Sequence, residues 1–416
     1  MFVYNSMLHD ARVRREARTL TDAGCQVTVL AVHEPGRTRR EEEVQGFRIL
    51  RISRSVLGLS RLEIRARLRG ESLLESRPAP PPSASPRPAR GLKVRLAAVL
   101  NGAVRLAFYP IRRVVVFIRF VRAGTHTQAD VYHAHDLNTL LMAWTTSRLR
   151  RARLVYDTHE VATDRTNMKL RWWACLLERA LIGRAERVIC TTQTRADFTQ
   201  KRYGIPPPVL LRNLPAYVEP EPSDLMHERL GLPAGEKLVL YQGGIQVQRG
   251  LEQLLDAASE IRGAAVVLLG SGRLKPALMA RAAELGLDGK VYFHDAVPVE
   301  ELPQWTACAY VGLQILQNTC FNHYSSLSNK LLEYLMAGVP AVASDLPEMR
   351  RVIEDTQAGM LVDASRPSAI AAAVNRLLED ETLRETMAQR ALQARRRYCW
   401  EQEQHLLREM YEGLFQ

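Results

Sequence analysis

The chain has 416 residues, of which 46% are apolar and 25% charged, a profile typical of a globular protein. This length is enough for two domains of ordinary size, each able to bury its own core. The formal net charge of +12 favours an anionic partner such as a nucleotide, a nucleic acid or an acidic lipid surface, without choosing among them.

Six cysteines are scattered at positions 25, 175, 190, 308, 320 and 399, with neither a CxxC pair nor Cys/His ligand spacing. This scatter predicts a reducing compartment and argues against a zinc site. No stretch reaches the ~20 apolar residues of a membrane span, and the N-terminus lacks a signal-peptide pattern. We therefore expect a cytoplasmic protein.

The first 53 residues predict the start of an α/β domain. Residues 2–4 read as the end of a strand, a helix with inward apolar spacing ends at Gly24, and strands follow at 26–32 and 47–53. The loop that carries Asp10 and Arg12 then lies at a strand's carboxyl end, where ligands bind in α/β sheets. Arg12 and Arg14 can equally be solvated helix charges.

Two unusual segments follow. Residues 71–91 are rich in Pro, Ser and Arg, so we expect an insertion that forms a loop or linker. Residues 92–122 mix apolar residues with six arginines and no acidic residue, and Pro110 predicts a kink. Such a basic amphipathic helix favours contact with an anionic membrane surface. A helix that covers the sheet and keeps a basic edge in water explains the same pattern.

Two successive predicted strands each have polar residues at their carboxyl ends. His133, His135 and Asp136 come at the end of the first, and the second ends with Asp157, His159 and Glu160. Because both sets of residues would lie at the same edge of the sheet, they predict a binding cleft there. The first three could be imagined as metal ligands, but a metal site needs further ligands at fitting positions.

The α/β alternation restarts after a boundary that we place near Pro215. A strand there runs into a loop with Gly243 and Gly244, and Arg249 stands just before the next helix. Glycines let the backbone approach a ligand closely, and a helix start attracts anions. A later strand ends at His294.

Residues 322–344 read as a polar loop, a helix from Lys330 with Asn329 as its cap, a stop at Gly338 and a strand. Glu333 lies in the apolar part of this helix, where an unpaired carboxylate is costly to bury. A phosphate at the helix start and a sugar hydroxyl one turn in would satisfy both features. The alternative is a surface helix whose Glu333 faces water.

The stretch SNKLLEYLMAGVPAVASDLPE (328–348) resembles the donor-site signature of retaining glycosyltransferases of family 4, which have the GT-B fold. Asp10, Arg12 and Val13 match the family's D-x-R-V motif, and residues 156–160 match Y-D-x-H-E. The resemblance implies an α/β protein of two Rossmann-like domains facing a central cleft. We expect an acceptor-binding domain at 1–214, a nucleotide-sugar-binding domain at 215–395, and a C-terminal helix at 396–416 that returns to the first domain.

Roles for individual residues follow from the same resemblance. In the family, the glutamate matching Glu333 holds the ribose, a basic residue matching Arg249 neutralises the leaving group, and the histidine matching His135 faces the transferred sugar. Lys330, at the start of the same helix as Glu333, is expected to share the neutralising role of Arg249. These four are the implied catalytic residues. The implied donor-binding residues add Gly243, Gly244, His294, Tyr324, Ser325, Ser326, Leu327, Asn329 and Leu331. The implied acceptor-binding residues are Asp10, Arg12, Asp136, His159 and Glu160.

One departure concerns the donor sugar. Family members usually carry a glutamate eight positions before the one matching Glu333, and Ser325 stands there in this chain. Branches with an N-H-Y-x-S-L-x-N-K loop, found here at 322–330, depart in the same way. We therefore expect backbone amides of residues 324–327 to contact the sugar.

These observations predict transfer of a glycosyl group, with retention of configuration, from a UDP- or GDP-linked sugar to a hydroxyl acceptor such as a glycan, a glycolipid or a small glycoside. No metal or other cofactor is expected, because Arg249, Lys330 and the helix dipole can replace a divalent ion. With no clear nucleophile, the leaving phosphate would take the acceptor's proton. A sugar-nucleotide epimerase on the same fold and a catalytically silent nucleotide-sugar-binding protein remain alternatives. A nucleic-acid binder is suggested by charge alone, without a recognition motif.

Overall fold

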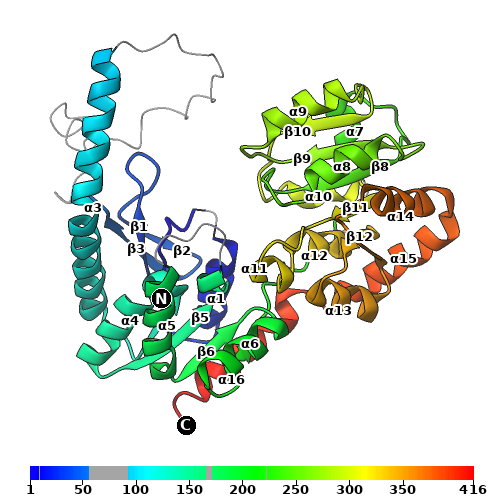
Figure 1. Cartoon of the computed structure of the whole chain (residues 1–416). Coiled ribbons are helices and arrows are strands. Elements are labelled where there is room, and N and C mark those ends of the chain that lie inside the picture. The colour runs from blue at the N-terminus through cyan, green and yellow to red at the C-terminus, as the bar shows by residue number, and fades with distance from the viewer. Residues whose placement is uncertain (9, 56–91, 165–170, 222) are drawn as a thin grey trace. The chain divides into compact units, whose positions relative to one another are not determined.

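The computed structural model describes the chain except for residues 9, 56–91, 165–170 and 222, and no side chain of residues 92–109. The predicted insertion at 71–91 lies outside the described residues. Contacts divide the chain into two units that interleave in sequence (Figure 1). Unit 1 comprises Met1–His159, Trp173–Ile189 and Met410–Gln416, and unit 2 comprises Glu160–Trp172 and Cys190–Glu409. The domain bounds expected from the sequence, 1–214, 215–395 and 396–416, stay a prediction.

The sheet of unit 1 is held together by a single short N-terminal segment. Strands β1 (Thr28–His33) and β3 (Phe47–Ser53) are parallel, and β2 (Glu41–Val44) is antiparallel to β3. Strands β4 (Val131–His135) and β5 (Arg153–Thr158) are also parallel, with β6 (Arg187–Cys190) beside β5. Phe2 bridges Leu30 of β1 and Ala134 of β4 in parallel fashion, so it joins the two groups of strands. The predicted strand end at residues 2–4 therefore exists as a short connecting strand.

Helices cover both faces of this sheet (Figure 1). Helix α1 (Ala11–Asp22) begins at Asp10, whose carboxylate accepts a hydrogen bond from the Val13 amide at 3.1 Å. Helices α4 (Leu137–Arg150) and α5 (Arg171–Leu181) follow β4 and β5, and α3 (Leu92–Thr127) continues through Pro110. Val116 and Phe120 of α3 are buried, and the Phe120 ring lies 6.3 Å from that of Phe2. The predicted basic helix thus exists, and one of its faces covers the sheet.

Unit 2 contains a six-stranded parallel sheet in the order β10-β9-β8-β11-β12-β13. Its strands are β8 (Leu238–Gln242), β9 (Ala265–Leu269), β10 (Val291–His294), β11 (Val311–Gln314), β12 (Ala341–Ser344) and β13 (Gly359–Val362). Numbered along the chain, this is the order 3-2-1-4-5-6 of a doubly wound fold, whose ligands bind where the strand order reverses. That point lies at the carboxyl ends of β8 and β11.

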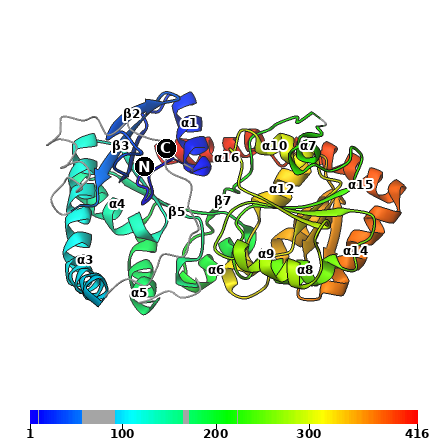
Figure 2. The ribbon, with the colours of Figure 1, turned by 90° about the horizontal axis from the view of Figure 1, so that it is seen from above.

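Two apolar layers enclose this sheet. Helices α8 (Leu251–Ala258), α9 (Lys275–Glu284) and α14 (Pro367–Glu379) pack on one face. The other face carries α7 (Leu225–Leu230), α10 (Leu302–Ala307), α12 (Asn329–Met336), α13 (Pro347–Thr356) and α15 (Glu381–Ala394). Figure 2 shows the sheet of this unit between these sets of helices. Three further helices are α6 (Gln193–Tyr203), α11 (Phe321–Tyr324) and α16 (Trp400–Glu412), and a short strand, β7 (Val209–Leu210), follows α6.

Close backbone approaches shape the ligand edge of unit 2. Gly250, at φ +79°, lies directly against the carbonyl of Ile315, so a side chain there would collide with backbone. Gly243, at φ +117°, packs against Lys330, whose Cε would be 3.2 Å from an added Cβ. Glycine is therefore required at both positions for the loop to hold its shape.

Within the described part of the chain, no helix is both long enough and apolar enough to span a bilayer.

Candidate active site

Glu333 is held at the ligand edge of unit 2 by a buried glutamine. Its carboxylate accepts a 2.6 Å hydrogen bond from the side chain of Gln242, the last residue of β8. Gln242 is 1% exposed, and its amide oxygen accepts a 2.9 Å hydrogen bond from the Thr306 hydroxyl. Glu333 itself is half-buried. This arrangement excludes the alternative of a surface helix whose glutamate only faces water, and Gln242 was not singled out in the sequence.

Lys330 lies beneath the glycine loop. The residue is 9% exposed, and its ammonium group stands 5.0 Å from the centroid of the Tyr241 ring. Burial, reinforced by the charge of Arg249, lowers the pKa of Lys330 to about 8. Arg249 follows Gln248, which has a strained φ of +67°, and precedes the Gly250 turn into α8. Two cations are thus placed together beside a loop whose backbone is open to a ligand.

Ser328, rather than Asn329, is the N-cap of α12, and its side chain makes no capping hydrogen bond. The prediction that Asn329 caps the helix is therefore wrong, because Asn329 already has helical geometry and begins the first turn. Its side chain is exposed and accepts a 3.3 Å hydrogen bond from Asn213. Leu331 is fully buried in the apolar layer, so its side chain packs rather than binds.

The loop before α12 is held by its own hydrogen bonds. The amides of Tyr324, Ser325 and Ser326 donate to backbone carbonyls of residues 320, 321 and 323, at 3.0, 2.9 and 3.2 Å. The Ser325 side chain is fully buried and donates to the Phe321 carbonyl at 2.7 Å. These three amides are therefore already hydrogen-bonded within the α11 turn, and the expected contact of residues 324–327 with a sugar stays a prediction.

Arg195 of α6 anchors this loop from within. It is 7% exposed and donates to the Ser325 hydroxyl at 3.2 Å, the Thr191 hydroxyl at 2.8 Å and the Asn322 carbonyl at 3.2 Å. Asn322 in turn exchanges side-chain hydrogen bonds with both backbone groups of Val161, at 2.9 and 3.1 Å. The position that carries a glutamate in the family is thus used here to hold the loop.

His294 ends β10 as predicted. Its ring centroid is 4.5 Å from that of Trp305, and its backbone carbonyl accepts the amide of Gly270 at 3.0 Å. The half-exposed ring lies at the same sheet edge as Gly243, because the Gly270 backbone touches the Gly243 carbonyl. The His294 and Trp305 rings therefore lie together at this edge of the sheet.

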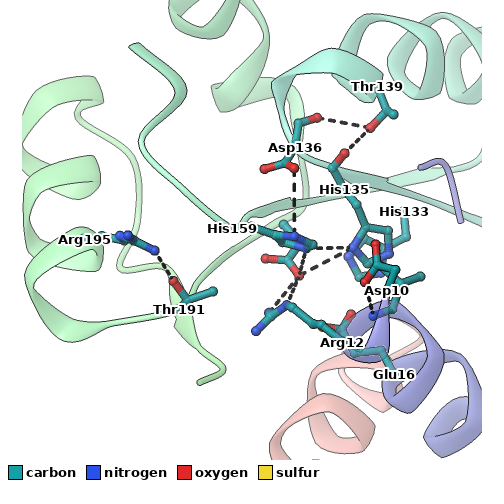
Figure 3. Close-up of polar contacts among 12 residues, drawn as sticks. Asp10, Arg12, Glu16, His133, His135, Asp136, Thr139, His159, Thr191 and Arg195 are labelled. Carbon is teal, nitrogen blue, oxygen red and sulfur yellow. Dashed lines mark hydrogen bonds and ion pairs between the residues drawn. The ribbon is translucent and has the colours of Figure 1, made fainter. Parts of the chain in front are cut away.

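In unit 1, the residues predicted at the ends of β4 and β5 form one cluster (Figure 3). Arg12 of α1 is 5% exposed and pairs with Asp157 at 2.8 Å and with Glu16 at 2.8 Å. His159 lies 3.2 Å from Asp157 and 3.9 Å from Asp136. Arg12 is therefore a buried ion-pair partner and not a solvated helix charge. The sequence does not single out Glu16, which lies one helical turn beyond Arg12.

The three histidines have unlike surroundings. His159 is 20% exposed, and although burial opposes its charged form, the charges of Asp157 and Asp136 raise its pKa to about 9. His135 is 2% exposed, and burial lowers its pKa, as it does more strongly for His133. His135, expected to face the sugar, points its nitrogens into the protein instead. Among the three histidines, His159 is the one with an exposed surface.

Asp136 has an unusual backbone, with φ +64° and ψ 160° at the start of α4. Its amide donates to the Asp157 carbonyl at 2.9 Å, and the Thr139 hydroxyl donates to its carbonyl at 3.1 Å. Strained residues of this kind persist where the surroundings hold them, often at functional sites. The strain turns the Asp136 carboxylate toward His159 (Figure 3). Asp10 lies nearby on α1, whereas Glu160 is exposed and belongs to unit 2.

Four buried atoms of this cluster could be imagined around a metal ion. One ligand atom each from Glu16, His133, His135 and Asp157 lies within 4.8 Å of the others. However, the rings of His133 and His135 are stacked, with centroids 4.2 Å apart and an interplanar angle of 18°. The nitrogen lone pairs of stacked rings lie in separate, nearly parallel planes. A tetrahedral metal ion needs the lone pairs of its ligands to converge on one point. Arg12 also neutralises both carboxylates, so the geometry favours a hydrogen-bonded cluster.

Comparison with known proteins identifies the class. Residues 10–214 match the model of the glycosyl transferase 4-like domain, and residues 236–380 match that of glycosyl transferases group 1. The chain therefore belongs to the glycosyltransferases of the family-4 group.

Named relatives and solved structures agree. The chain is 26% identical over 321 residues to a D-inositol 3-phosphate glycosyltransferase of Xylanimonas cellulosilytica, covering 70% of this chain and 74% of that protein. It is 31% identical to a Nocardioides protein of the same name, covering 44% and 43%. Sucrose-phosphate synthase from Thermosynechococcus elongatus aligns with a TM-score of 0.73 at 18% identity, covering 97% and 92%. HepE from Anabaena, solved with UDP and glucose, aligns at 0.69 and 15%, covering 99% and 98%. The GT-B fold is thereby confirmed.

Proposed function

We propose that this glycosyltransferase takes a sugar from a UDP-linked donor held by unit 2 and transfers it to a hydroxyl group with retention of configuration. The observation that carries the proposal is the placement of Lys330 and Arg249 at the glycine loop, with Glu333 one helical turn further along α12. A diphosphate would lie against the two cations and the backbone amides at the start of α12. The half-buried carboxylate, turned by Gln242, would accept hydrogen bonds from ribose hydroxyls.

The proposed nucleotide is UDP, because HepE, a similar structure, was solved with UDP-glucose. The His294 ring and the neighbouring backbone at the end of β10 offer a platform for the base. We propose no metal role in the transfer, since Arg249 and Lys330 supply positive charge where the leaving diphosphate develops negative charge.

In unit 1 we assign the substrate hydrogen bond to His159 in place of His135. Flanked by Asp157 and Asp136, the His159 ring keeps its proton through neutral pH and can donate to a sugar or acceptor hydroxyl. Arg12 and Asp157 would act behind it as fixed charges that hold its orientation.

A donor screen tests the proposal. UDP-, GDP-, ADP- and dTDP-sugars are added to the protein, and the melting temperature is expected to rise only with UDP-linked donors, since a ligand of the folded state stabilises it. Proton NMR of the product should show the anomeric configuration of the donor, with a rate unchanged by EDTA. Arg249→Ala should abolish transfer and donor hydrolysis while leaving the melting temperature of the free protein unchanged. Release of UDP with an epimerised sugar and no acceptor consumed would support the epimerase alternative.

We also propose that α3 docks on an anionic membrane surface. Ile111, Val114 and Ile118 are 49%, 57% and 56% exposed, and their spacing places them on one stripe of the helix. Arg112, Arg113 and Arg122 are exposed beside this stripe. An apolar stripe flanked by arginines suits a headgroup region with negative charge.

Vesicle sedimentation tests this docking. The protein should pellet with vesicles that contain phosphatidylglycerol and not with phosphatidylcholine alone, and added salt should release it. Ile118→Glu should weaken binding, whereas Val299→Glu, at a site in unit 2 that is 64% exposed, should not. Equal binding by both variants would exclude α3 as the docking element.

A further inference from the structure

Tyr411, near the end of α16, contacts the histidine cluster from behind. Its hydroxyl lies 2.9 Å from Nδ1 of His133, and both residues belong to unit 1. Burial raises the pKa of the Tyr411 hydroxyl well above its usual value, so the group keeps its proton and can donate it. Tyr411 and His133 are 278 residues apart, so the sequence alone does not indicate this contact.

The proton positions in the cluster can be followed from the surface inward. His159, charged between two carboxylates, directs Nε2 to Asp157 at 3.2 Å and to Nδ1 of His135 at 3.2 Å. A protonated Nε2 of His159 requires Nδ1 of His135 to be an acceptor. The single proton of neutral His135 then resides on its Nε2.

The same logic applies to His133 from the other side. If Tyr411 donates to Nδ1 of His133, the proton of that neutral ring also resides on Nε2. Within the described residues, the buried side-chain atoms without a hydrogen-bond partner include His133 Nε2, His135 Nε2, Glu16 Oε2 and Asp157 Oδ1. With both protons on Nε2, each ring has a donor in the group of residues that includes the ionised Asp157, whereas burial raises the pKa of Glu16 to about 8. With the opposite tautomers, both Nε2 atoms would be acceptors close to the buried Asp157 carboxylate, which is unfavourable in a buried site.

We propose that Tyr411 is a positioning residue that fixes the tautomers of the stacked His133 and His135 rings, and through them the charged, substrate-facing state of His159. The inference rests on the function proposed for His159. The groups that face the cluster are Asp10, Arg12 and Glu16 from α1, His133, His135 and Asp136 from β4 and its end, Asp157 from β5, and Tyr411 from α16. Tyr411 is the hydroxyl among them, and its removal leaves every charge in place.

The test is Tyr411→Phe, which deletes one oxygen. We expect the alkaline fall in activity to move about one pH unit lower, so that kcat/KM changes little at pH 7 and falls about fivefold at pH 9. Histidine ¹⁵N NMR of the unliganded protein should show the Nε2–H tautomer at His133 in the original protein and a mixture in the variant. Tyr398→Phe is the matched control, since that hydroxyl donates to Asp355 at 2.8 Å in unit 2.

A second pair of variants tests the geometry at His133. The amide nitrogen of His133→Gln reaches the Nε2 position, whereas that of His133→Asn reaches Nδ1, so the glutamine variant should keep more activity. Activity loss in Tyr411→Phe with an unmoved alkaline limb and unchanged ¹⁵N shifts would overturn the proposal, as would stoichiometric zinc in the purified protein. The NMR measurement needs no turnover, so failure of the proposed glycosyl transfer is distinguishable from failure of the tautomer assignment.

Discussion

The two candidate sites hold their charges in opposite ways. In unit 2, two positive groups, Lys330 and Arg249, lie close together. Burial and the charge of Arg249 lower the pKa of Lys330 to about 8. In unit 1, the cation Arg12 is paired with two carboxylates, and Asp157 keeps a pKa well below its usual range, since Arg12 and His159 outweigh its burial. In unit 2 two cations therefore lie beside the glycine loop, as the proposed anion site requires, whereas the charged groups of unit 1 pair with one another. Substitutions in the first should mainly change ligand binding, and substitutions of the paired charges in the second should change stability as well as activity.

The largest effect is expected at Glu333. Glu333→Gln keeps the shape of the side chain but removes the charge that accepts ribose hydroxyls and the Gln242 amide. Loss of a charged acceptor that contacts the donor should lower kcat/KM by about 10²–10³-fold. UDP release from the donor measures it, and Glu379→Gln, which removes an exposed ion pair with Arg262, is the control. A fall of less than threefold would contradict the role of Glu333.

Asp157→Asn should give the largest loss of stability. It leaves Arg12 and His159 buried with less negative charge, and removal of one partner from a buried ion pair costs about 3–5 kcal/mol. In the original protein, His159 contributes stability that is complete below pH 6.5 and is lost as the pH rises through about 9. Asp157→Asn should lose that alkaline transition in a denaturant titration.

An exposed ion pair, Asp345 with Arg350, is the control for the loss of stability expected from Asp157→Asn. Asp345→Asn breaks the contact with Arg350 at 2.5 Å, where both side chains are exposed. Such surface pairs contribute about 0–1 kcal/mol. If the two variants were equally stable, the buried network of unit 1 would have no special energetic role.

An intermediate effect is expected from pH on nucleotide binding. Lys330 is charged below its pKa of about 8, and a bound diphosphate favours the charged form. The Kd for UDP should therefore rise about tenfold between pH 7 and pH 9, measured by calorimetry. Lys330→Arg should bind with little pH dependence over this range. A constant Kd in the original protein would remove Lys330 from the phosphate site.

The smallest losses of stability are expected at two helix N-caps, Thr192 of α6 and Ser328 of α12. The Thr192 hydroxyl accepts from the Arg195 amide at 3.3 Å and donates to the Ser325 carbonyl at 3.0 Å, so Thr192→Ala should cost about 1–2 kcal/mol. Ser328→Ala should change stability by less than about 0.5 kcal/mol, because its side chain makes no capping bond. Urea unfolding measures both, and a larger loss for Ser328→Ala would show that its hydroxyl acts in the folded state.

The local patterns of the sequence were sufficient for the strands, the glycine loop, the α12 helix and the resemblance to the family. Alternation, helical spacing and Gly243 act over a few residues, so they can be recognised without knowing what lies nearby. The same patterns placed Glu333, Lys330 and Arg249 at one edge of a sheet, because the carboxyl ends of parallel strands are adjacent.

Tertiary structure alone decided which polar groups meet. Arg12 and Asp157 are 145 residues apart, Gln242 and Glu333 are 91 apart, and Arg195 and Ser325 are 130 apart. It also decided that His159, and not His135, keeps an accessible surface, since the direction of a side chain at a strand end depends on what packs against it. Short-range pattern fixes the backbone, whereas burial and pairing between distant segments determine the charge and the chemistry of each site.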